Sequence, residues 1–413
     1  MSESFPYEIF WNDPRPEISW DTPDGLWVGH WKYGWYDQIG DEVLKLTDEF
    51  EYEVWQPDLR ADKIYTYAYN KNLSHKLFPA EIKRKLYGLK KITYVTSKSI
   101  MENLITESTK NRLIIHLDGI NPGISREVLD LNLNCPIVVQ FLGEVRHPLK
   151  NLLRLRKNVM AKINDVSEHF VLKKLFKKAT IVLFINEKGQ SNLMKYSMNE
   201  KILLPIGIDF NYWKRKSEKE YIRKALGFKN NSLILLSSSR LNSSKQVDKM
   251  ILVLKKLDNN YDFQYIVTGH GEQQYEKYLT HLGENLIRKG KLKFVGYLPE
   301  EKLIDYYNAA DLFVITSLCE GAPVAAIKAA AMEIPIFSTD TGFVAEQLSR
   351  YDVGIVVPLK DYRNWELKLK EFFSGQEITI MQREIAESVF HWPNVAARYL
   401  IMYKKLYATY YQG

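Results

Sequence analysis

The chain is poor in cysteine: its two cysteines, Cys135 and Cys319, stand far apart in 413 residues. This spacing excludes a disulfide framework and a paired-cysteine zinc site, and it favours a reducing compartment. The opening residues, MSESFPYEIFWNDP, lack the basic and apolar segments of a secretion signal. No run approaches the roughly 18 apolar residues that a membrane-spanning helix needs. These absences predict a soluble, cytoplasmic protein.

The chain also lacks a G-x-G-x-x-G fingerprint in either half, which argues against a dinucleotide enzyme. Repeats of short fixed period and low-complexity tracts are absent too. Apolar residues make up 46% of the chain, too many for a disordered protein. Because 413 residues exceed what one hydrophobic core usually organises, we expect two domains.

Net charge is a moderate +7, but basic residues are concentrated in one stretch. Residues 146–178 contain ten basic and two acidic residues, with apolar residues interleaved. This pattern predicts one or two basic amphipathic helices. Two interpretations stay open: a solvated helical face beside a core, or a surface that lies on an anionic membrane leaflet. Nucleic acid is not an expected partner.

Short apolar runs alternate with helical patterns in both halves of the chain. In the first half the clearest strands are expected at 112–117, 136–141 and 180–185. After Pro205 the alternation restarts, with strands expected at 232–237, 263–268, 292–295, 312–316, 336–338 and 354–357. This alternation is typical of β–α–β units with parallel strands. The sequence therefore predicts an α/β fold of two tandem domains, followed by a helix from Pro393 to about Tyr410.

The strand expected at 232–237 leads into a loop that carries Arg240 and Lys245. Ligands of parallel α/β sheets bind at the carboxyl ends of the strands, where these two cations would converge on a pair of phosphates. An ordinary exposed basic loop would contain the same residues, and the motif alone does not decide between the two interpretations.

The strand expected at 312–316 is followed by Glu320, Gly321 and Pro323, and then by a helix over 324–332. Pro323 suits the first turn of that helix, whose free backbone N–H groups would bind phosphate. Glu320 would repel a phosphate, so its carboxylate is better suited to accept hydrogen bonds from sugar hydroxyls. The simpler alternative is an acid that interacts with the helix dipole.

Two glycine-containing turns follow other expected strands. Gly296, Tyr297 and Leu298 would present backbone groups to the edge of a nucleobase. The run TGHG, which ends at Gly271, is a second short glycine loop. Plain strand-to-helix turns explain both segments equally well.

In their order and spacing, these motifs resemble those of the retaining GT-B glycosyltransferases of family GT4. The resemblance runs from about Ala179 to Tyr403 and includes the segments PIGID, Arg240 to Lys245, TGHG, KFVGYLPEEKLIDYYNAADLFV, SLCEGAPVAAIKAAAMEIPI, TDTGFVAEQL with Glu346, and FHWPNVAARYLIMY. It implies two Rossmann-like domains, 1–205 and 206–392, that face each other across a cleft. It also implies that the helix 393–413 packs back on the first domain.

The resemblance implies transfer of a sugar from a nucleotide sugar, such as a UDP- or GDP-sugar, to a glycan, lipid-linked or cell-envelope acceptor. The anomeric configuration would be retained, and no metal or cofactor would be required. Arg240 and Lys245 would hold the diphosphate and stabilise the departing nucleoside diphosphate, and Glu320 would contact the sugar. The implied donor-binding residues are Gly34, Gly296, Tyr297, Leu298, Gly321, Ala322, Pro323, Val324 and Lys328.

The chain departs from the family pattern at two positions. Eight residues after Glu320 the family has a second glutamate that receives ribose hydroxyls, but this chain has Lys328, which cannot accept a hydrogen bond. The family histidine after the strand at 136–141 is replaced by Leu142. Candidates for sugar or acceptor contacts nearby are His116, Asp118, Glu144 and His147, and nothing in the sequence selects one.

Three functions stay open. The motifs favour an active transferase that works in the cytoplasm or on the cytoplasmic face of a membrane. Lys328 and Leu142 suggest a catalytically weakened relative that acts as a partner or scaffold, although the retained phosphate clamp argues against it. A nucleotide-binding epimerase or a sugar phosphorylase is the third function, because one fold serves many activities.

Overall fold

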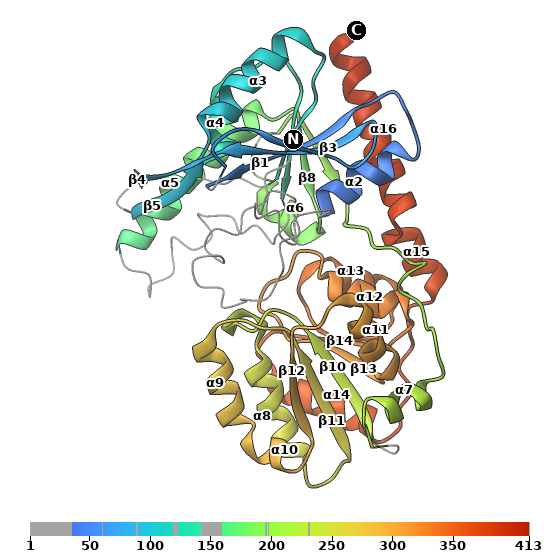
Figure 1. Cartoon of the computed structure of the whole chain (residues 1–413). Helices are drawn as coiled ribbons and strands as arrows, with labels where there is room; N and C mark the ends of the chain where they lie inside the picture. Colours follow the sequence, from blue (N-terminus) through green and yellow to red (C-terminus); the bar gives the residue numbers. More distant parts are fainter. Residues whose placement is uncertain are drawn as a thin grey trace. The chain divides into compact units, whose positions relative to one another are not determined.

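The computed structural model describes residues 35–59, 61–87, 90–118, 123–141, 159–194, 196, 198–229 and 232–412. The chain divides into two compact units (Figure 1). The first comprises Met1–Leu204 and Val395–Gly413, and the second comprises Pro205–Asn394. Each unit is built on a parallel sheet with helices, which confirms the predicted α/β class. In the described part of the chain, no helix is both long and apolar enough to span a membrane.

The first unit is centred on a parallel sheet with the strand order β6-β7-β8-β9. Its strands are β6 (Ile115–Asp118), β7 (Ile137–Phe141), β8 (Ile181–Phe184) and β9 (Glu200–Leu203). All residues of β7 and β8 are buried, as expected for parallel strands that are covered on both faces. The helices around this sheet are α3 (Lys98–Lys110), α4 (Ile124–Asp130), α5 (Val159–Lys178) and α6 (Glu187–Leu193).

Before this sheet the chain forms a second, mixed sheet and a hairpin. Helix α2 (Trp35–Leu44) precedes β1 (Tyr52–Asp58), β2 (Tyr65–Ala68) and β3 (Leu73–Pro79), which pair in the order β1-β3-β2. Strands β4 (Glu81–Tyr87) and β5 (Lys90–Thr96) form an antiparallel hairpin.

Helix α16 (Trp392–Tyr411) completes the first unit, although its first residues belong to the second. Tyr403 Oη lies 2.8 Å from His116 Nδ1, and the Gln140 amide donates to Tyr399 Oη over 2.8 Å. Each of these four side chains is at most 6% exposed. The helix thus covers polar groups of β6 and β7 that would otherwise lie open at the sheet.

The second unit contains a six-stranded parallel sheet with the order β12-β11-β10-β13-β14-β15. Its strands are β10 (Leu233–Ser238), β11 (Phe263–Thr268), β12 (Leu292–Gly296), β13 (Leu312–Ile315), β14 (Ile336–Thr339) and β15 (Ile355–Val357). Its helices are α7 (Lys219–Ala225), α8 (Val247–Leu257), α9 (Gln273–Leu282), α10 (Glu284–Arg288), α11 (Glu300–Ala309), α12 (Val324–Ala331), α13 (Gly342–Tyr351), α14 (Tyr362–Phe373) and α15 (Arg383–Phe390).

The order of strands in this sheet creates a switch point. From β10 the chain adds β11 and β12 toward one edge, and it then returns to add β13, β14 and β15 toward the other. The connections that leave β10 and β13 therefore diverge to opposite faces. A crevice opens between the carboxyl ends of these two neighbouring strands, and ligands of such folds bind there.

Gly342 begins α13 in a backbone conformation that favours glycine, with φ of +80°. A Cβ at this position would lie 2.6 Å from Glu320 Cβ and 2.9 Å from the Gly321 carbonyl oxygen. Gly342 thus combines a left-handed backbone with close packing against the loop that carries Glu320.

We expect Gly342→Ala to lower the free energy of unfolding of the second unit by about 2 to 4 kcal/mol, because backbone strain and steric overlap add. Gly227→Ala is the matched control. Gly227 also has a positive φ, of +70°, but nothing lies within 4 Å of the added Cβ. The control should cost about 1 kcal/mol. Urea-dependent hydrogen exchange in β10 and β13 measures both changes, and equal losses would refute the steric contribution.

Candidate active site

The loop after β10 positions Arg240 and Lys245 at the switch point. Asn242 caps the short 3-10 helix Ser243–Lys245, and its side chain accepts from the Ser244 N–H over 3.1 Å. The loop is also bound to the segment after β13: the Leu318 N–H donates to the Ser244 carbonyl over 2.8 Å, and the Thr316 hydroxyl to the Lys245 carbonyl over 2.7 Å. These hydrogen bonds join two loops that are distant in sequence along one side of the site.

Glu320 is held by a third segment, the connection between β14 and α13. Its N–H donates to the Thr341 hydroxyl over 2.9 Å, and the Phe343 N–H donates to the Gly321 carbonyl over 2.7 Å. The carboxylate accepts from Lys245 Nζ over 2.6 Å and from the Ser317 hydroxyl. Because the side chains of Lys245 and Glu320 are only 21% and 12% exposed, water screens this ion pair weakly.

A cavity of about 320 Å³ unites these groups. Arg240, Lys245 and Glu320 all line it, so the structure brings together three residues that the sequence placed on separate motifs. The other lining residues are Ser237, Ser238, Ser239, Val247, Val314, Ile315, Thr316, Ser317, Ala322, Pro323, Val324 and Ala325. Thr316 and Ser317 were not predicted, because a hydroxyl at the end of a strand carries no motif of its own.

The amino end of α12 opens into the same cavity. Pro323 is the N-cap, and no side chain of the described residues caps the helix there. The positive end of the helix dipole and the first N–H groups therefore add to the charges of Arg240 and Lys245. Arg240 is exposed and forms no ion pair with any residue that the structure describes. The arrangement fits a multiply charged anion with a polar, hydroxyl-bearing group beside it.

These residues lie in a segment that matches a known family. Residues 218–389 match the family model described as glycosyl transferases group 1. The match covers most of the second unit, Pro205–Asn394. The group 1 match extends from α7 to α15 and so contains every cavity residue named above.

Relatives of known name match somewhat less than half of the chain. TuaC of Bacillus subtilis, provisionally named a teichuronic acid biosynthesis glycosyltransferase, is 28% identical over 190 residues, 45% of this chain and 46% of TuaC. The glycogen synthase of Desulfitobacterium hafniense is 30% identical over 207 residues, 47% of this chain and 44% of the synthase. The chain spans about half the length of the curated relatives it matches.

Solved structures resemble a larger part of the chain. The sucrose-phosphate synthase of Thermosynechococcus elongatus has a TM-score of 0.69 at 16% identity and covers 90% of this chain, which in turn covers 92% of it. HepE of Anabaena, solved with UDP-glucose, has a TM-score of 0.58 at 15% identity, with 74% and 82% covered. At such identities the likeness shows the fold, which is GT-B with two Rossmann-like domains.

Lys328, which lies within the group 1 match, does not line the cavity. Its ammonium group binds the Glu300 carboxylate and lies 4.2 Å from the centre of the Trp213 ring. Burial lowers the pKa of Lys328, and the Glu300 charge opposes this effect. The Lys328 side chain is thus held by two protein groups, and its direct contact with a donor stays a prediction.

The turn at Gly296, Tyr297 and Leu298 is bound to the neighbouring turn after β11. The Gly269 N–H donates to the Gly296 carbonyl over 2.7 Å, and the Ser239 N–H donates to the Thr268 carbonyl over 3.2 Å. Through these bonds the turn that was expected to contact a base is linked to the loop of Arg240. Tyr297 is 54% exposed, so its ring is accessible to a ligand.

The structure describes only some of the residues of the first unit that were predicted to contact the donor or acceptor. His116 is 3% exposed and bonded to Tyr403, so we assign it a role in holding α16 and no longer a sugar contact. Asp118 ends β6, but the surroundings of its side chain are not described. Gly34, Leu142, Glu144 and His147 lie outside the described residues, as does the part of the basic stretch from Arg146 to Asn158.

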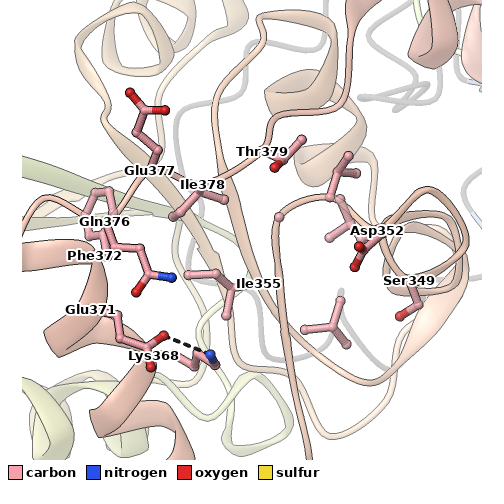
Figure 2. A pocket seen from close by; sticks show the side chains of 14 residues that line it. Ser349, Asp352, Ile355, Lys368, Glu371, Phe372, Gln376, Glu377, Ile378 and Thr379 are labelled. Atoms are coloured by element: carbon pink, nitrogen blue, oxygen red, sulfur yellow. Dashed lines mark hydrogen bonds and ion pairs between the residues drawn. The ribbon is translucent and has the colours of Figure 1, made fainter.

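A second cavity, of about 490 Å³, lies at the start of β15, the edge strand of the second unit's sheet (Figure 2). It is lined by the carboxyl ends of α13 and α14, by the start of β15 and by the segment from Gln376 to Thr379. Lys368 Nζ and a Glu371 carboxylate oxygen form an ion pair there over 2.8 Å. Figure 2 marks this pair with a dashed line. None of the predicted site residues lines this cavity, and we place the candidate active site at the first one.

Burial lowers the pKa of His116 to about 3. Because an unfolded histidine titrates near pH 6.5, the unfolded state binds the proton first, and stability falls as the pH drops from about 6.5 toward 3. We expect the first unit to lose about 1 to 2 kcal/mol between about pH 7 and about pH 5.

Hydrogen exchange in β6 and α16 measures this loss. His116→Gln should flatten the pH dependence, even though its stability at neutral pH is lower. His281→Gln, which removes an exposed histidine of the second unit, should leave the slope in β6 and α16 unchanged. An unchanged slope in His116→Gln would show that other groups cause the pH dependence.

Proposed function

We propose that the protein transfers a sugar from a nucleotide-sugar donor to a glycan, lipid-linked or cell-envelope acceptor, with retention of the anomeric configuration and without a metal or cofactor. The observation that carries this proposal is the convergence of Arg240, Lys245 and Glu320 in one cavity at the uncapped start of α12. The group 1 match and the resemblance of the motifs support it. A UDP- or GDP-sugar is the expected donor, and HepE, with the same fold, was solved with UDP-glucose.

In this proposal the diphosphate lies between the α12 amino end and the Arg240 side chain. Negative charge grows on the diphosphate as the bond to the sugar breaks, and fixed positive groups stabilise that charge more strongly in a partly buried cavity than in water. Arg240, Lys245 and the free N–H groups of α12 supply this stabilisation. The chemistry thus needs no proton donor for the leaving group.

In this proposal Lys245 binds the diphosphate and Glu320 binds the sugar, while the two side chains stay paired. Without a ligand, the pair keeps both charges compensated in a poorly screened site. When a diphosphate arrives, Lys245 shares its three donors between phosphate and Glu320. The Glu320 carboxylate accepts hydrogen bonds from sugar hydroxyls, which orients the sugar for transfer.

A scaffold function has less support. A protein that only served as a partner would gain nothing from three loops that hold a lysine, an arginine and a carboxylate around one cavity. For the acceptor we propose only a chemical class. TuaC and the amylovoran biosynthesis glycosyltransferase AmsK of Erwinia amylovora are named for surface polysaccharides, which favours an envelope glycan.

Helix α5 supports work at the cytoplasmic face of a membrane. Phe170 is 63% exposed, and Lys173, Lys174 and Lys177 are exposed on the same side of the helix. Lys174 binds Asp130 over 2.9 Å, whereas Lys173 and Lys177 form no ion pair with any described residue. An exposed aromatic ring among free lysines suits the interface of an anionic bilayer.

We expect Arg240→Ala to weaken binding of UDP, GDP or ADP, whichever binds the wild type, by about tenfold to a hundredfold, since it removes a charge-assisted contact to phosphate. Lys229→Ala is the control, because it removes one exposed lysine at the opposite edge of the same sheet. Titration calorimetry with each nucleotide measures the affinities. Equal affinity of Arg240→Ala and wild type would sink the proposed phosphate site.

Lys173→Gln combined with Lys177→Gln should reduce partition onto vesicles that contain phosphatidylglycerol by about tenfold or more at low salt, at about 1 kcal/mol per lysine. Vesicles of phosphatidylcholine alone should bind neither protein. The control is Lys98→Gln with Lys110→Gln, which removes two exposed lysines from α3. Vesicle sedimentation measures the partition, and equal loss in both double variants would contradict a specific role for α5.

A further inference from the structure

Lys328 and Glu300 form an asymmetric ion pair. The lysine side chain is 12% exposed, whereas the glutamate side chain is 55% exposed. Trp213 packs against the ammonium group, with 4.2 Å between Nζ and the ring centre. Trp213 is itself 2% exposed and stacks edge-on against Tyr307. The cation is therefore enclosed, and its acidic partner is the member of the pair that a ligand can reach.

Glu300 has hydrogen-bond acceptor positions that its contact with Lys328 does not use. Its contact with Lys328 is made through Oε1, and Oε2 has no hydrogen-bond partner among the described residues. An ionised carboxylate offers about four acceptor positions, so one ammonium contact leaves most of them available. Glu300 is also the first residue of α11, where the helix dipole favours the ionised form.

The position of Glu300 follows from the two elements that it joins. It comes directly after the turn of Gly296, Tyr297 and Leu298, and it is bound to a residue one helical turn beyond Val324 and Ala325, which line the diphosphate cavity. Helical side chains lean toward the amino end, so the Lys328 side chain extends along the preceding turn of α12. The Tyr307 hydroxyl donates to the Ala325 carbonyl over 2.9 Å and fixes α11 against the first turn of α12.

We propose that Glu300 accepts hydrogen bonds from the ribose hydroxyls of the donor nucleotide, and that Lys328 is the residue that positions it. This inference rests on the proposed function, since it concerns the same donor. The ribose of a nucleotide joins the diphosphate to the base. Glu300 follows the turn suited to the base, and it is paired with a residue of the helix that begins at the diphosphate cavity. A lysine at position 328 cannot accept from a hydroxyl, so the acceptor is supplied from the neighbouring helix.

The proposal assigns the site a preference for ribonucleotides. A carboxylate that accepts from a ribose hydroxyl discriminates against a ligand that lacks this hydroxyl, because the ligand then leaves an acceptor of the site without its hydrogen bond. We therefore compare UDP with its 2′-deoxy and 3′-deoxy analogues, with the GDP and ADP series in parallel, by titration calorimetry on the full chain. Wild type should bind at least one deoxy analogue about tenfold more weakly than the ribonucleotide.

Glu300→Gln should reduce this ribose preference to less than about threefold, because the amide is neutral and presents a single acceptor oxygen. Glu301→Gln is the matched control: Glu301 is exposed, follows Glu300 in α11, and is not paired with Lys328. It should keep the wild-type preference. Lys328→Gln should lower the preference as well, since the carboxylate loses its anchor, whereas loss of a merely structural pair would change stability and leave the preference intact.

The outcomes separate this inference from the proposed function. If wild type binds none of the nucleoside diphosphates, the proposed function itself fails. If wild type binds them but does not distinguish ribose from deoxyribose, or if Glu300→Gln keeps the distinction, the Glu300 assignment alone is overturned. Should Glu300→Gln fold poorly because Lys328 is left unpaired, the double variant Glu300→Gln with Lys328→Gln carries no buried charge and must show the same loss of preference.

Discussion

The candidate site depends on the pairing of β10 with β13. These strands are distant in sequence, yet their carboxyl ends lie side by side, and the loops that leave them are bound at Ser244 and Lys245. Separately, each loop is a weak phosphate motif. Because the hydrogen bonds across the switch point fix one loop against the other, the cation of one and the carboxylate of the other meet at 2.6 Å.

Two lysine–glutamate ion pairs lie on the loops and helices near the candidate site, and they differ in how exposed the acid is. In the pair of Lys245 and Glu320 both members are largely buried, and a ligand must share the lysine with the acid. In the pair of Lys328 and Glu300 only the lysine is buried. Desolvating a charge is costly unless it is paired, so each lysine needs its acid whether or not a ligand is present. Each lysine can therefore stay charged in the free protein.

The sequence predicts the second unit better than the first. Strands at 263–268 and the helix at 247–257 agree with β11 and α8 to the residue, because buried parallel strands and amphipathic helices have strong periodic patterns. Strand β3 and the hairpin of β4 and β5 were missed, since charged residues interrupt their apolar patterns. The roles of Arg240, Lys245 and Glu320 stay predictions, although the structure brings the three side chains into one cavity.

Other residues depend on partners that no local pattern reveals. Whether His116 is a ligand or a core residue is decided by Tyr403, which is 287 positions away. The side chain of Lys328 is positioned by Glu300 and Trp213, neither of which belongs to its own helix. Sequence reasoning identified Lys328 as unusual, but the consequence of the substitution required the contacts of two other segments.

The return of α16 to the first unit has a consequence for biosynthesis. The second unit is one continuous stretch, Pro205–Asn394, whereas the first needs the last residues of the chain to cover His116 and Gln140. During translation the first unit is therefore made first but completed last. Until α16 is made, the polar side chains that it covers in the first unit stay exposed to solvent. A chain that stops before Val395 would leave that unit without this helix.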